Sequence, residues 1–582
     1  MLDLSTQLSA SRDVSSVPVL NESSFRLGKY RDGSVLKFRG VVRDVQDPEL
    51  VLLSGVDAAQ QLMERLPLTV TLFPHASDWA TQAYRNVSVV DSATGTMEPT
   101  EETKQEQKDG CSVGTGTKRS NEVVEPSREE TKQEQKDSHA KKPKSMEKQS
   151  GSDQTDRLLL PDAVNIFVYD GQYKDMPLDA FKVNEAFEFV GILDLMVTGS
   201  GLKKTDTELS AKEIEELQIS DCIEEVQHKE RSGLVLHCCH VSQLENLHHV
   251  RPHEPSEFYM QIQESNETRT KFCQDEWVKL GREKEVATMR KQLIDYLAQT
   301  MHGDILAAEY LLLNLLSHVY SRADPSTPLG NLSLNLALEK SSSAEEKGAF
   351  VAQLHKTVAS LMPMVAQVDL SLSDLNSAKF MPYKDYEREV LLSGVLQMAN
   401  GTIMLVNETT LTAGQLNEQG VKNIAALQSL IEKMLLPYDF HFYNMDFPQD
   451  VAVVTVSEGK SILPVNVAVP LVTTDDADSK ESSAVMPGEQ LLECFRLFLS
   501  VLRLLIVTIG NEEADMAEKH YVECRKSQQK VALEDLHRWL RLARLMALSR
   551  GEGEISKASW DAMLALETQR LARSTSNEST ST

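Results

Sequence analysis

The chemistry that the sequence most readily suggests is phosphate binding at Gly459-Lys460-Ser461, because this tripeptide ends the phosphate loop of nucleotide hydrolases. A complete loop also needs a glycine five positions before the Gly-Lys pair, so that backbone N–H groups can surround a phosphate. Val454 occupies that position. The segment VAVVTVSE reads as a buried strand, and Pro464 follows where a helix would have to begin. We therefore interpret the tripeptide as a turn after a strand.

A second group of reactive side chains contains histidines and cysteines that could ligate zinc. These are His228, His237, Cys238, Cys239, His240, His248, His249 and His253. Neighbouring side chains in the strand-like LHCCHV point to opposite faces, and the segment has no C-x-x-C pair that would hold one ion from one side. We expect a buried strand followed by a polar loop, with no metal and no cofactor.

The overall charge of the chain favours protein partners over nucleic acid. Sixty basic residues against 87 acidic ones leave a net charge of -27, which repels phosphate backbones. Seven cysteines and the absence of a signal peptide at the start indicate a reducing compartment. The most apolar helix candidate, residues 489–510, carries Arg496 and Arg503, so it is expected to pack against the protein and not to span a membrane. At 582 residues, two or three domains are expected.

One polar segment interrupts the chain. Between Asp91 and Arg157 there is no Phe, Trp, Tyr, Ile or Leu, so this stretch cannot bury enough apolar surface to offset its chain entropy. We predict a disordered insertion at 92–157. Its cluster KKPK, residues 141–144, is either a nuclear import signal or a solvated lysine run.

Short strands flank the insertion and predict a small barrel of the oligonucleotide/oligosaccharide-binding (OB) type, with its first part at 31–91 and its second at 158–260. The strands are expected at 34–45, 67–74, 163–170, 185–196 and 233–241. Such barrels often stack bases on exposed aromatic side chains. Phe38, Phe73, Trp79 and Tyr169 are available here, but their strand-like spacing favours a place in the core.

After the barrel, strands and helices alternate from 283 to 475, which predicts a mostly parallel sheet with helices on its faces. Two helices break at His302-Gly303, where Asp304 can cap the second helix by accepting from its free N–H groups. A helical segment is expected at 487–570, and terminal tails at 1–30 and 571–582.

Long stretches of the chain resemble a known family. They are GDILAAEYLLLNLLSHVYSR, FMPYKDY, LLSGVLQMANGTIMLVNETTL, YDFHFYNMDFP and VTVSEGKSILP, with KFRGVVRDVQDPE and DWATQAY upstream. In order, over most of residues 30–570, they are similar to the mini-chromosome maintenance (MCM) complex-binding protein family of eukaryotes. The resemblance implies an OB-like barrel, a degenerate AAA+-like core at 283–475 and a C-terminal helical lid at 487–570.

The same resemblance implies a non-catalytic, nuclear protein that binds MCM helicase subunits. Its role would lie in helicase assembly, protection or unloading during DNA replication, with support for sister-chromatid cohesion. MCM subunits end one core strand in an Asp-Glu pair that serves Mg²⁺ and water, whereas this chain has Asn407-Glu408. Where a phosphate loop would follow the strand at 332–338, the sequence reads EKSSSAEEKGAF, with one glycine and two adjacent glutamates. Asn407-Glu408 is therefore an ordinary strand end or the remnant of a nucleotide site.

Two other functions are compatible with the predicted domains. A working AAA+ remodeller is disfavoured by the missing phosphate loop, and a single-strand-binding OB protein is disfavoured by the net charge of -27. The predicted lid also contains Arg538, Arg541 and Arg544, which recur every three residues opposite Leu536 and Leu540. These arginines form either a solvated basic face or a docking surface for an acidic neighbour, and they are our candidate partner-binding residues.

Overall fold

The computed structural model describes most of the chain outside the polar insertion. The described residues are 30–54, 60–85, 163–169, 181–195, 234–244, 246–251, 286–339, 342–387, 390–472, 487–527 and 531–580, with short runs between 17 and 25 and between 262 and 275. The insertion predicted at 92–157 lies outside them, as do its KKPK cluster, His228 and His253.

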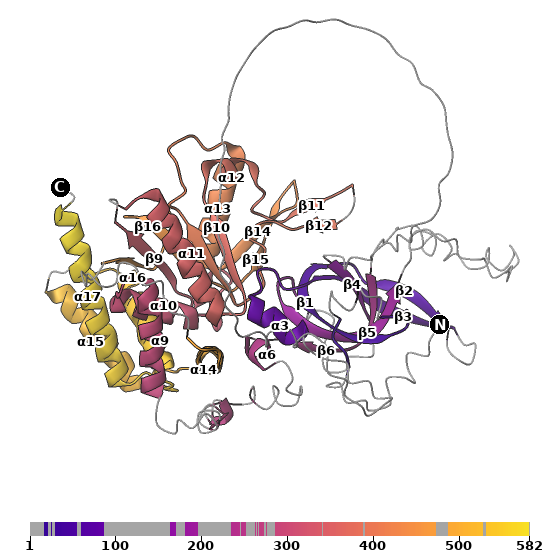
Figure 1. The fold of residues 1–582 in the computed structure, drawn as a ribbon, viewed down its shortest axis with the longest axis horizontal. Coiled ribbons are helices and arrows are strands. Elements are labelled where there is room, and N and C mark those ends of the chain that lie inside the picture. The colour runs from indigo at the N-terminus through magenta and orange to yellow at the C-terminus, as the bar shows by residue number, and fades with distance from the viewer. Residues whose placement is uncertain are drawn as a thin grey trace, which may run out of the picture. The chain divides into compact units, whose positions relative to one another are not determined.

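The first part of the chain forms a closed five-stranded barrel (Figure 1). Its strands are β1 (Val35–Val45), β3 (Gln60–Thr71), β4 (Ala163–Tyr169), β5 (Ala186–Leu195) and β6 (Leu234–Gln243). They follow one another as β1-β5-β6-β4-β3, and pairing between β1 and β3 closes the ring. An extra strand, β2 (Glu49–Ser54), which the sequence did not suggest, pairs with β3 outside this ring.

Glycines allow the barrel strands to approach each other closely. A Cβ on Gly40 of β1 would lie 2.4 Å from the carbonyl oxygen of Thr71 in β3, and a Cβ on Gly191 of β5 would lie 2.5 Å from that of His237 in β6. Both distances are far below van der Waals contact, so only glycine fits at these two close approaches. Register shifts accompany these positions in β1 and in the β5–β6 pair.

The barrel interior is filled by alternate side chains of its strands. Phe38 and Phe189 face each other across the β1–β5 pair, and both are buried. Tyr169 is buried as well, in a separate cluster with Phe167 and Val235, so the expectation of a buried position is confirmed for Phe38 and Tyr169. Trp79 lies in the helix α3 (Asp78–Arg85) and donates its indole N–H to the carbonyl oxygen of Ala359 at 2.9 Å.

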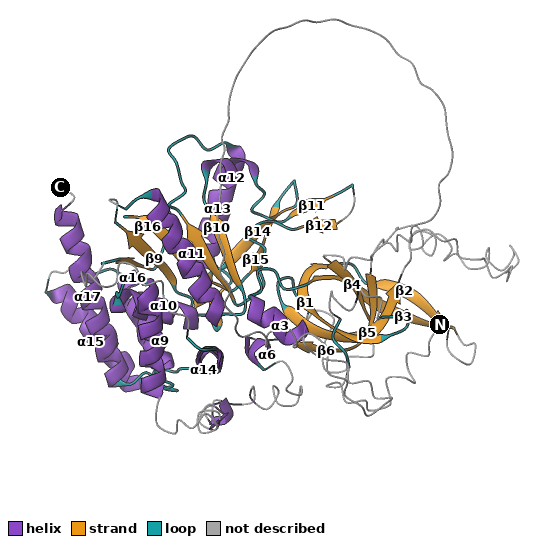
Figure 2. Cartoon of the chain, viewed as in Figure 1, coloured by secondary structure: helices purple, strands orange, loops and turns teal. Residues whose placement is uncertain are grey.

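The second part contains the expected parallel sheet with helices on its faces (Figure 2). Its strands are β9 (Ser333–Leu338), β10 (Val365–Asp369), β13 (Thr402–Asn407), β16 (Val451–Glu458) and β17 (Val467–Pro470), in the spatial order β10-β13-β16-β9-β17. The helices are α9 (Val286–Thr300), α10 (Ile305–Leu316), α11 (Ala344–Leu361), α12 (Leu372–Ser377) and α13 (Glu418–Lys433). Asp304 caps α10 as predicted, because its side chain accepts from the N–H of Ala307 at 3.1 Å.

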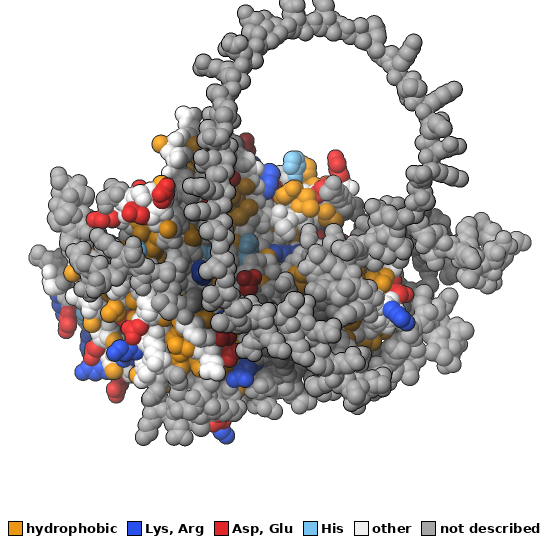
Figure 3. Space-filling view, in the orientation of Figure 1, with side chains coloured by type: hydrophobic (Ala, Val, Ile, Leu, Met, Phe, Trp, Pro, Cys, Tyr) orange, Lys and Arg blue, Asp and Glu red, His pale blue; other side chains and the backbone are white. Residues whose placement is uncertain are grey.

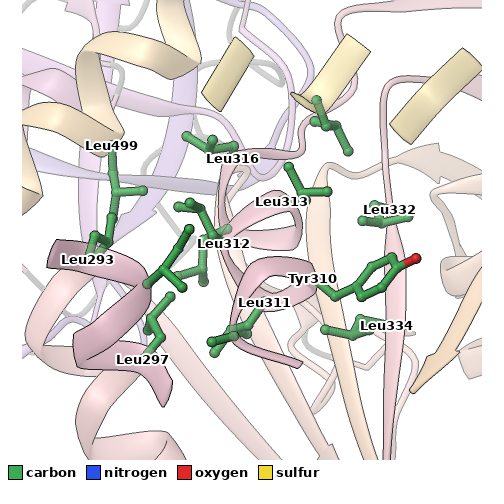
Figure 4. Packing of buried hydrophobic residues seen from close by; sticks show 14 of the residues in the cluster. Leu293, Leu297, Tyr310, Leu311, Leu312, Leu313, Leu316, Leu332, Leu334 and Leu499 are labelled. Atoms are coloured by element: carbon green, nitrogen blue, oxygen red, sulfur yellow. The ribbon is translucent and has the colours of Figure 1, made fainter. Parts of the chain in front are cut away.

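Both faces of the parallel sheet are buried, which explains why its strands are apolar without alternation. Leu405 of β13 and Val454 of β16 belong to one hydrophobic cluster, whereas Met404 and Val453 belong to another on the opposite face. In the first cluster α10 packs against both α9 and β9, and Figure 4 shows Leu293 of α9 on one side of α10 and Leu334 of β9 on the other.

A smaller sheet accompanies the core. It is built from two hairpins, β11 (Tyr383–Asp385) with β12 (Val390–Leu392) and β14 (Leu435–Asp439) with β15 (Asn444–Pro448), in the order β12-β11-β14-β15. A separate short hairpin joins β7 (Ser321–Asp324) to β8 (Thr327–Leu329).

The C-terminal helices do not form a core of their own. They are α14 (Glu489–Leu504), α15 (Asn511–Lys526), α16 (Leu533–Ser549) and α17 (Lys557–Thr580). Their buried residues, including Phe498, Leu545 and Trp560, share one cluster with α9, α10 and the sheet. Helix α17 also runs past residue 570, where the tail was expected to begin. Within the described ranges, no helix is both long enough and apolar enough to cross a membrane.

Hydrogen bonds from buried polar side chains join the barrel to the core. Arg43 of β1 donates from Nη1 to the carbonyl oxygen of Gln397 at 2.8 Å. The Gln397 amide donates to the hydroxyl oxygen of Tyr438 at 3.0 Å, and that oxygen also accepts from the amide of Asn184 at 3.0 Å. Ser77, after the last strand before the insertion, donates its hydroxyl to the carbonyl oxygen of Met362 at 2.6 Å.

The pairing of β3 with β4 predicts that the barrel survives a cut in the chain between them. We expect a site-specific protease, acting on a recognition sequence inserted between residues 92 and 157, to leave two fragments that elute together on a sizing column. The reason is that strands before the cut pair with strands after it. Seven residue pairs join β3 to β4, and seven join β1 to β5.

Ile166→Asp is the matched control, because it places a charge at a fully buried position of β4 and should release the fragments after the same cut. Separate elution of the fragments of the otherwise unchanged protein would contradict the barrel.

Candidate functional site

The residues that the sequence singled out for nucleotide chemistry meet at one edge of the parallel sheet. Asn407 ends β13, Glu458 ends β16, and Leu338 ends β9, with β16 lying between the other two strands. The carboxyl ends of parallel strands are where open α/β sheets bind ligands. This edge is therefore the candidate site, and the contacts of its side chains determine what it can bind.

Glu408 is held by the turn that follows β16. The Ser461 hydroxyl donates to Oε1 of Glu408 at 2.5 Å, and the N–H of Ile462 donates to Oε2 at 3.0 Å. Both carboxylate oxygens thus accept hydrogen bonds from the chain itself. The side chain is buried, and this burial raises the pKa of the Glu408 carboxyl above its usual range. In the sequence, Glu408 and Ser461 belong to two unrelated motifs, whereas in the structure their side chains are hydrogen-bonded.

Asn407 also makes internal contacts. Its amide donates to Oδ1 of Asp369 at 2.7 Å, which links the ends of β13 and β10. Its Oδ1 accepts from the N–H of Thr409 at 3.1 Å and from the Thr409 hydroxyl at 2.7 Å. An asparagine in this network supplies a neutral oxygen that is already twice hydrogen-bonded, which is a poor ligand for Mg²⁺.

The N-terminus of α11, which follows β9, carries its own negative charges. Ser343 accepts from the N–H of Glu346 at 3.2 Å, while the Glu346 carboxylate accepts from the N–H of Ser343 at 2.8 Å, which completes a capping box. Glu345 lies in the same first turn. A helix N-terminus attracts anions through its free N–H groups and its dipole. Here carboxylates satisfy that attraction, and they would repel a phosphate.

A lysine that the sequence did not identify lies beside this helix start. Lys347 is buried, and its Nζ lies 2.8 Å from Oε1 of Glu458 at the end of β16. The pair joins α11 to the central strand of the sheet. The only sequence signal was the Lys347-Gly348 dipeptide in the segment where a phosphate loop was sought.

The tripeptide Gly459-Lys460-Ser461 forms a turn, as predicted. Gly459 has a φ of +76°, a left-handed conformation that favours glycine, and its N–H donates to the carbonyl oxygen of Leu338 at 3.3 Å. Ser457 donates its hydroxyl to the carbonyl oxygen of Gly459 at 3.0 Å. Lys460 is exposed to solvent. The turn therefore ties β16 to β9 and does not wrap around a ligand.

The arginines of α16 do not form the single exposed face that we expected. Arg538 donates to Asp535 at 2.6 Å and to Glu567 of α17 at 3.2 Å. Arg541 is partly buried, and Arg544 is only 5% exposed, with its guanidinium 3.9 Å from the ring centre of Tyr320. Three-residue steps turn by about 300° on a helix, so two steps rotate a side chain by about 120° around the axis. That rotation places Arg544 in the interior. The role of the three arginines in partner binding stays a prediction.

The histidine and cysteine side chains of β6 contact barrel residues. His237 lies with Nδ1 2.5 Å from the Tyr169 hydroxyl and Nε2 3.4 Å from Asp194. Cys238 points into the barrel core. In the helix α6 (Asn246–Val250), His249 packs edge-on against Phe73, and its burial lowers the histidine pKa to about 3. Across the part of the chain that the structure describes, no three His, Cys, Asp or Glu residues are grouped to hold a metal ion.

Comparison with known proteins shows to which family the chain belongs. A family model described as mini-chromosome maintenance replisome factor matches residues 53–574. The chain belongs to this family. The matched range includes the parallel sheet, the two hairpins and the C-terminal helices, so the resemblance seen in the sequence is confirmed.

Several similar proteins are named mini-chromosome maintenance complex-binding protein. The protein from Salmo salar is 30% identical over 95% of this chain and 90% of its own length. The Homo sapiens protein is 28% identical over 96% of this chain and 91% of its own length. The Gallus gallus protein is 33% identical over 68% of this chain and 60% of its own length.

The contacts at the sheet edge predict that nucleotide does not stabilise the protein. Millimolar ATP with Mg²⁺ should shift the melting temperature by less than about 1 °C, because ligands stabilise a fold only through sites that the folded state offers. Lys460→Ala should melt at the same temperature as the unchanged protein, with or without ATP. A nucleotide-dependent rise that this substitution abolishes would contradict the internal closure of the site.

The burial of Arg544 predicts opposite outcomes for two substitutions. Arg544→Glu should lower the free energy of unfolding by about 3–5 kcal/mol, because it places an uncompensated carboxylate in the interior. Arg544→Met should change it by less than about 1 kcal/mol, because the guanidinium nitrogens are buried without hydrogen-bond partners. Urea unfolding followed by circular dichroism measures both. Equal stability of the Glu and Met variants would show that the side chain is exposed.

Proposed function

We propose that this chain is a non-catalytic binding partner of MCM helicase subunits. The support is membership of a family whose members, over almost the whole length of this chain, are named for binding the MCM complex. The observation that favours a non-catalytic role is the sheet edge, where Glu408, Asn407 and Lys347 contact their own chain. Binding, and not hydrolysis, is then the activity of the core.

We further propose that the core is a degenerate AAA+-like domain, a pseudo-ATPase, preceded by an OB-like barrel. Support for the core comes from β9 leading into α11 where a phosphate loop would stand, and from β13 ending where MCM subunits carry their Asp-Glu pair. Support for the OB-like barrel comes from its closed ring, in which β4 and β6 are parallel and the other neighbours are antiparallel.

A working AAA+ remodeller is the alternative from another class. It would need a lysine and backbone N–H groups that are free to hold phosphates. Lys347 is instead paired with Glu458, and the first turn of α11 carries two glutamates. These contacts favour the binding protein over the remodeller.

A single-strand-binding barrel is the other alternative. It would need unpaired basic side chains beside exposed aromatic rings. In the barrel, Arg39 is paired with Glu188 and Arg65 with Glu49, while the ring of Phe167 is buried beneath the Arg65 guanidinium. Neutralised arginines of this kind gain little from a phosphate backbone.

The biological role that we propose is helicase assembly, protection or unloading in the nucleus, with consequences for DNA replication and sister-chromatid cohesion. MCM subunits stand side by side in a ring. A chain with a similar barrel and core could take the place of one subunit, contact its neighbour and block ring closure without hydrolysing nucleotide. Such an interface would be large and partly apolar.

Affinity purification tests the proposal. Full-length protein with a tag, expressed in cells, should recover MCM subunits identified by mass spectrometry. Recovery should be the same after the lysate is depleted of ATP, because no nucleotide site of this chain takes part. Lys460→Ala is the matched variant and should recover the same subunits, whereas a remodeller would lose them. A folded protein that recovers no MCM subunit would overturn the proposal.

A further inference from the structure

The smaller sheet ends in an open strand edge. Strand β15 pairs with β14 on one side, and no described strand lies on its other side. Two backbone hydrogen bonds fix the alternation of the β14–β15 ladder, since the Gln449 N–H donates to the Met434 carbonyl oxygen and the Phe440 N–H donates to the Tyr443 carbonyl oxygen, each at 3.0 Å. The backbone N–H and C=O groups of Asn444 and Asp446 consequently point away from β14, toward the open side.

Large apolar side chains surround this edge. Phe442 is 84% exposed, Tyr443 is 55% exposed and Met445 is 46% exposed, and Tyr386 of the neighbouring hairpin is exposed as well. Tyr443, directly before β15, and Met445 on β15 are two residues apart in extended chain, so they lie on one face of the hairpin. Figure 3 shows hydrophobic side chains gathered on the surface in the region of these hairpins. A contiguous apolar surface of this kind marks an interaction site.

The hairpin tip is held in one conformation without a partner. The rings of Phe440 and Tyr443 are stacked, with centres 5.3 Å apart and an angle of 8° between their planes. The Tyr386 hydroxyl donates to the carbonyl oxygen of Phe440 at 2.9 Å, and the N–H of His441 donates to Asp439 at 2.7 Å. Because the tip is already ordered, binding there costs little conformational entropy.

The charge around the edge selects the kind of partner. The described residues of the two hairpins contain four carboxylates and one lysine, namely Asp385, Glu387, Asp439, Asp446 and Lys384. A negative surface repels a phosphate backbone and attracts basic side chains. A charged residue and a proline on an edge strand, here Asp446 and Pro448, limit non-specific pairing with other strands. The exposed aromatic rings beside them do not protect the edge in this way.

We propose that the β15 edge binds an extended, basic and apolar segment of a protein partner as an added strand. The N–H and C=O groups of Asn444 and Asp446 bond to the backbone of that segment. Tyr443 and Met445 contact its apolar side chains, and the surrounding carboxylates bind its lysines or arginines. This inference deepens the proposed function and rests on it for the identity of the partner as an MCM subunit. The chemistry of the bound segment rests on the hairpin alone.

Synthetic probes test the chemistry of the edge with the full-length protein. The first probe is a fluorescent ten-residue peptide in which lysine alternates with valine and threonine, and the second replaces every lysine by glutamate. The third is a twenty-nucleotide oligothymidylate. Fluorescence anisotropy should show binding of the lysine peptide at least tenfold tighter than of the other two. Preferred binding of the oligothymidylate, or no binding of the lysine peptide, would overturn the proposal.

Two substitutions separate backbone pairing from charge. Asp446→Pro removes an outward N–H and leaves the ladder to β14 intact, because Asp446 lies opposite Pro437 at a position without a ladder bond. This variant should bind the lysine peptide at least tenfold more weakly than the unchanged protein does. Asp446→Asn removes the same charge but keeps the N–H, and it should weaken binding only two- to threefold. Equal effects of the two variants would overturn strand addition.

A third substitution covers the case in which Asp446→Pro disturbs the hairpin. Met445→Lys changes an exposed side chain whose backbone is bonded to β14, so the fold should be retained by circular dichroism. It should weaken the lysine peptide at least fivefold by placing a like charge on the contact face. A folded Met445→Lys variant that binds the peptide as before would contradict the proposal.

Purification of MCM subunits with the same variants distinguishes the two conclusions. Reduced recovery by Asp446→Pro and Met445→Lys supports both. Full recovery by both variants leaves the proposed function in place and overturns the β15 edge as the contact. If the unchanged protein recovers no MCM subunit, the proposed function fails, and the lysine peptide alone decides whether the edge binds strands.

Discussion

The arrangement of barrel and core depends on the buried hydroxyl of Tyr438. That oxygen accepts from Gln397, whose carbonyl oxygen binds Arg43 of the barrel, and from Asn184, which lies next to the barrel strand β5. Burial lowers the pKa of Arg43 to about 10 and raises that of Tyr438 to about 12, so the arginine is charged and the tyrosine neutral at physiological pH. Tyr438 also lies on β14, so the junction and the β15 hairpin share a strand.

The sheet edge illustrates how the same positions can serve binding or stability. A nucleotide site must keep polar groups available for a ligand, and unsatisfied groups lower stability. Here Glu408, Asn407 and Lys347 connect β13, β16, β10, α11 and the turn after β16. The contacts are short in space and long in sequence, since Glu408 and Ser461 are 53 residues apart. These contacts satisfy the polar groups at the sheet edge that a bound ligand would satisfy in a nucleotide site, and they thereby stabilise the fold.

The sequence predicted those features that depend on local patterns. The buried strands of the parallel sheet appear as apolar runs, Asp304 appears as a cap, and Gly459 appears as a turn residue, because each depends on a few neighbouring residues. Features that depend on distant segments were missed. The burial of Arg544 requires Tyr320, which is 224 positions earlier, and the pairing of β14 with β11 requires two hairpins to meet. Strand β2 was missed since it follows β1 after a very short break.

The strand order of the barrel has a consequence for synthesis of the chain. Strands β1 and β3 are complete at Thr71, but the last strand, β6, ends at Gln243, which is 172 residues later. At translation rates of about 5–20 residues per second, roughly 10 to 30 s pass before the ring can close. During that time the ring stays open, because the edges of β4 and β5 that pair with β6 have no partner until β6 is made. We therefore expect chaperones to bind the ribosome-bound chain mainly before Gln243 is made.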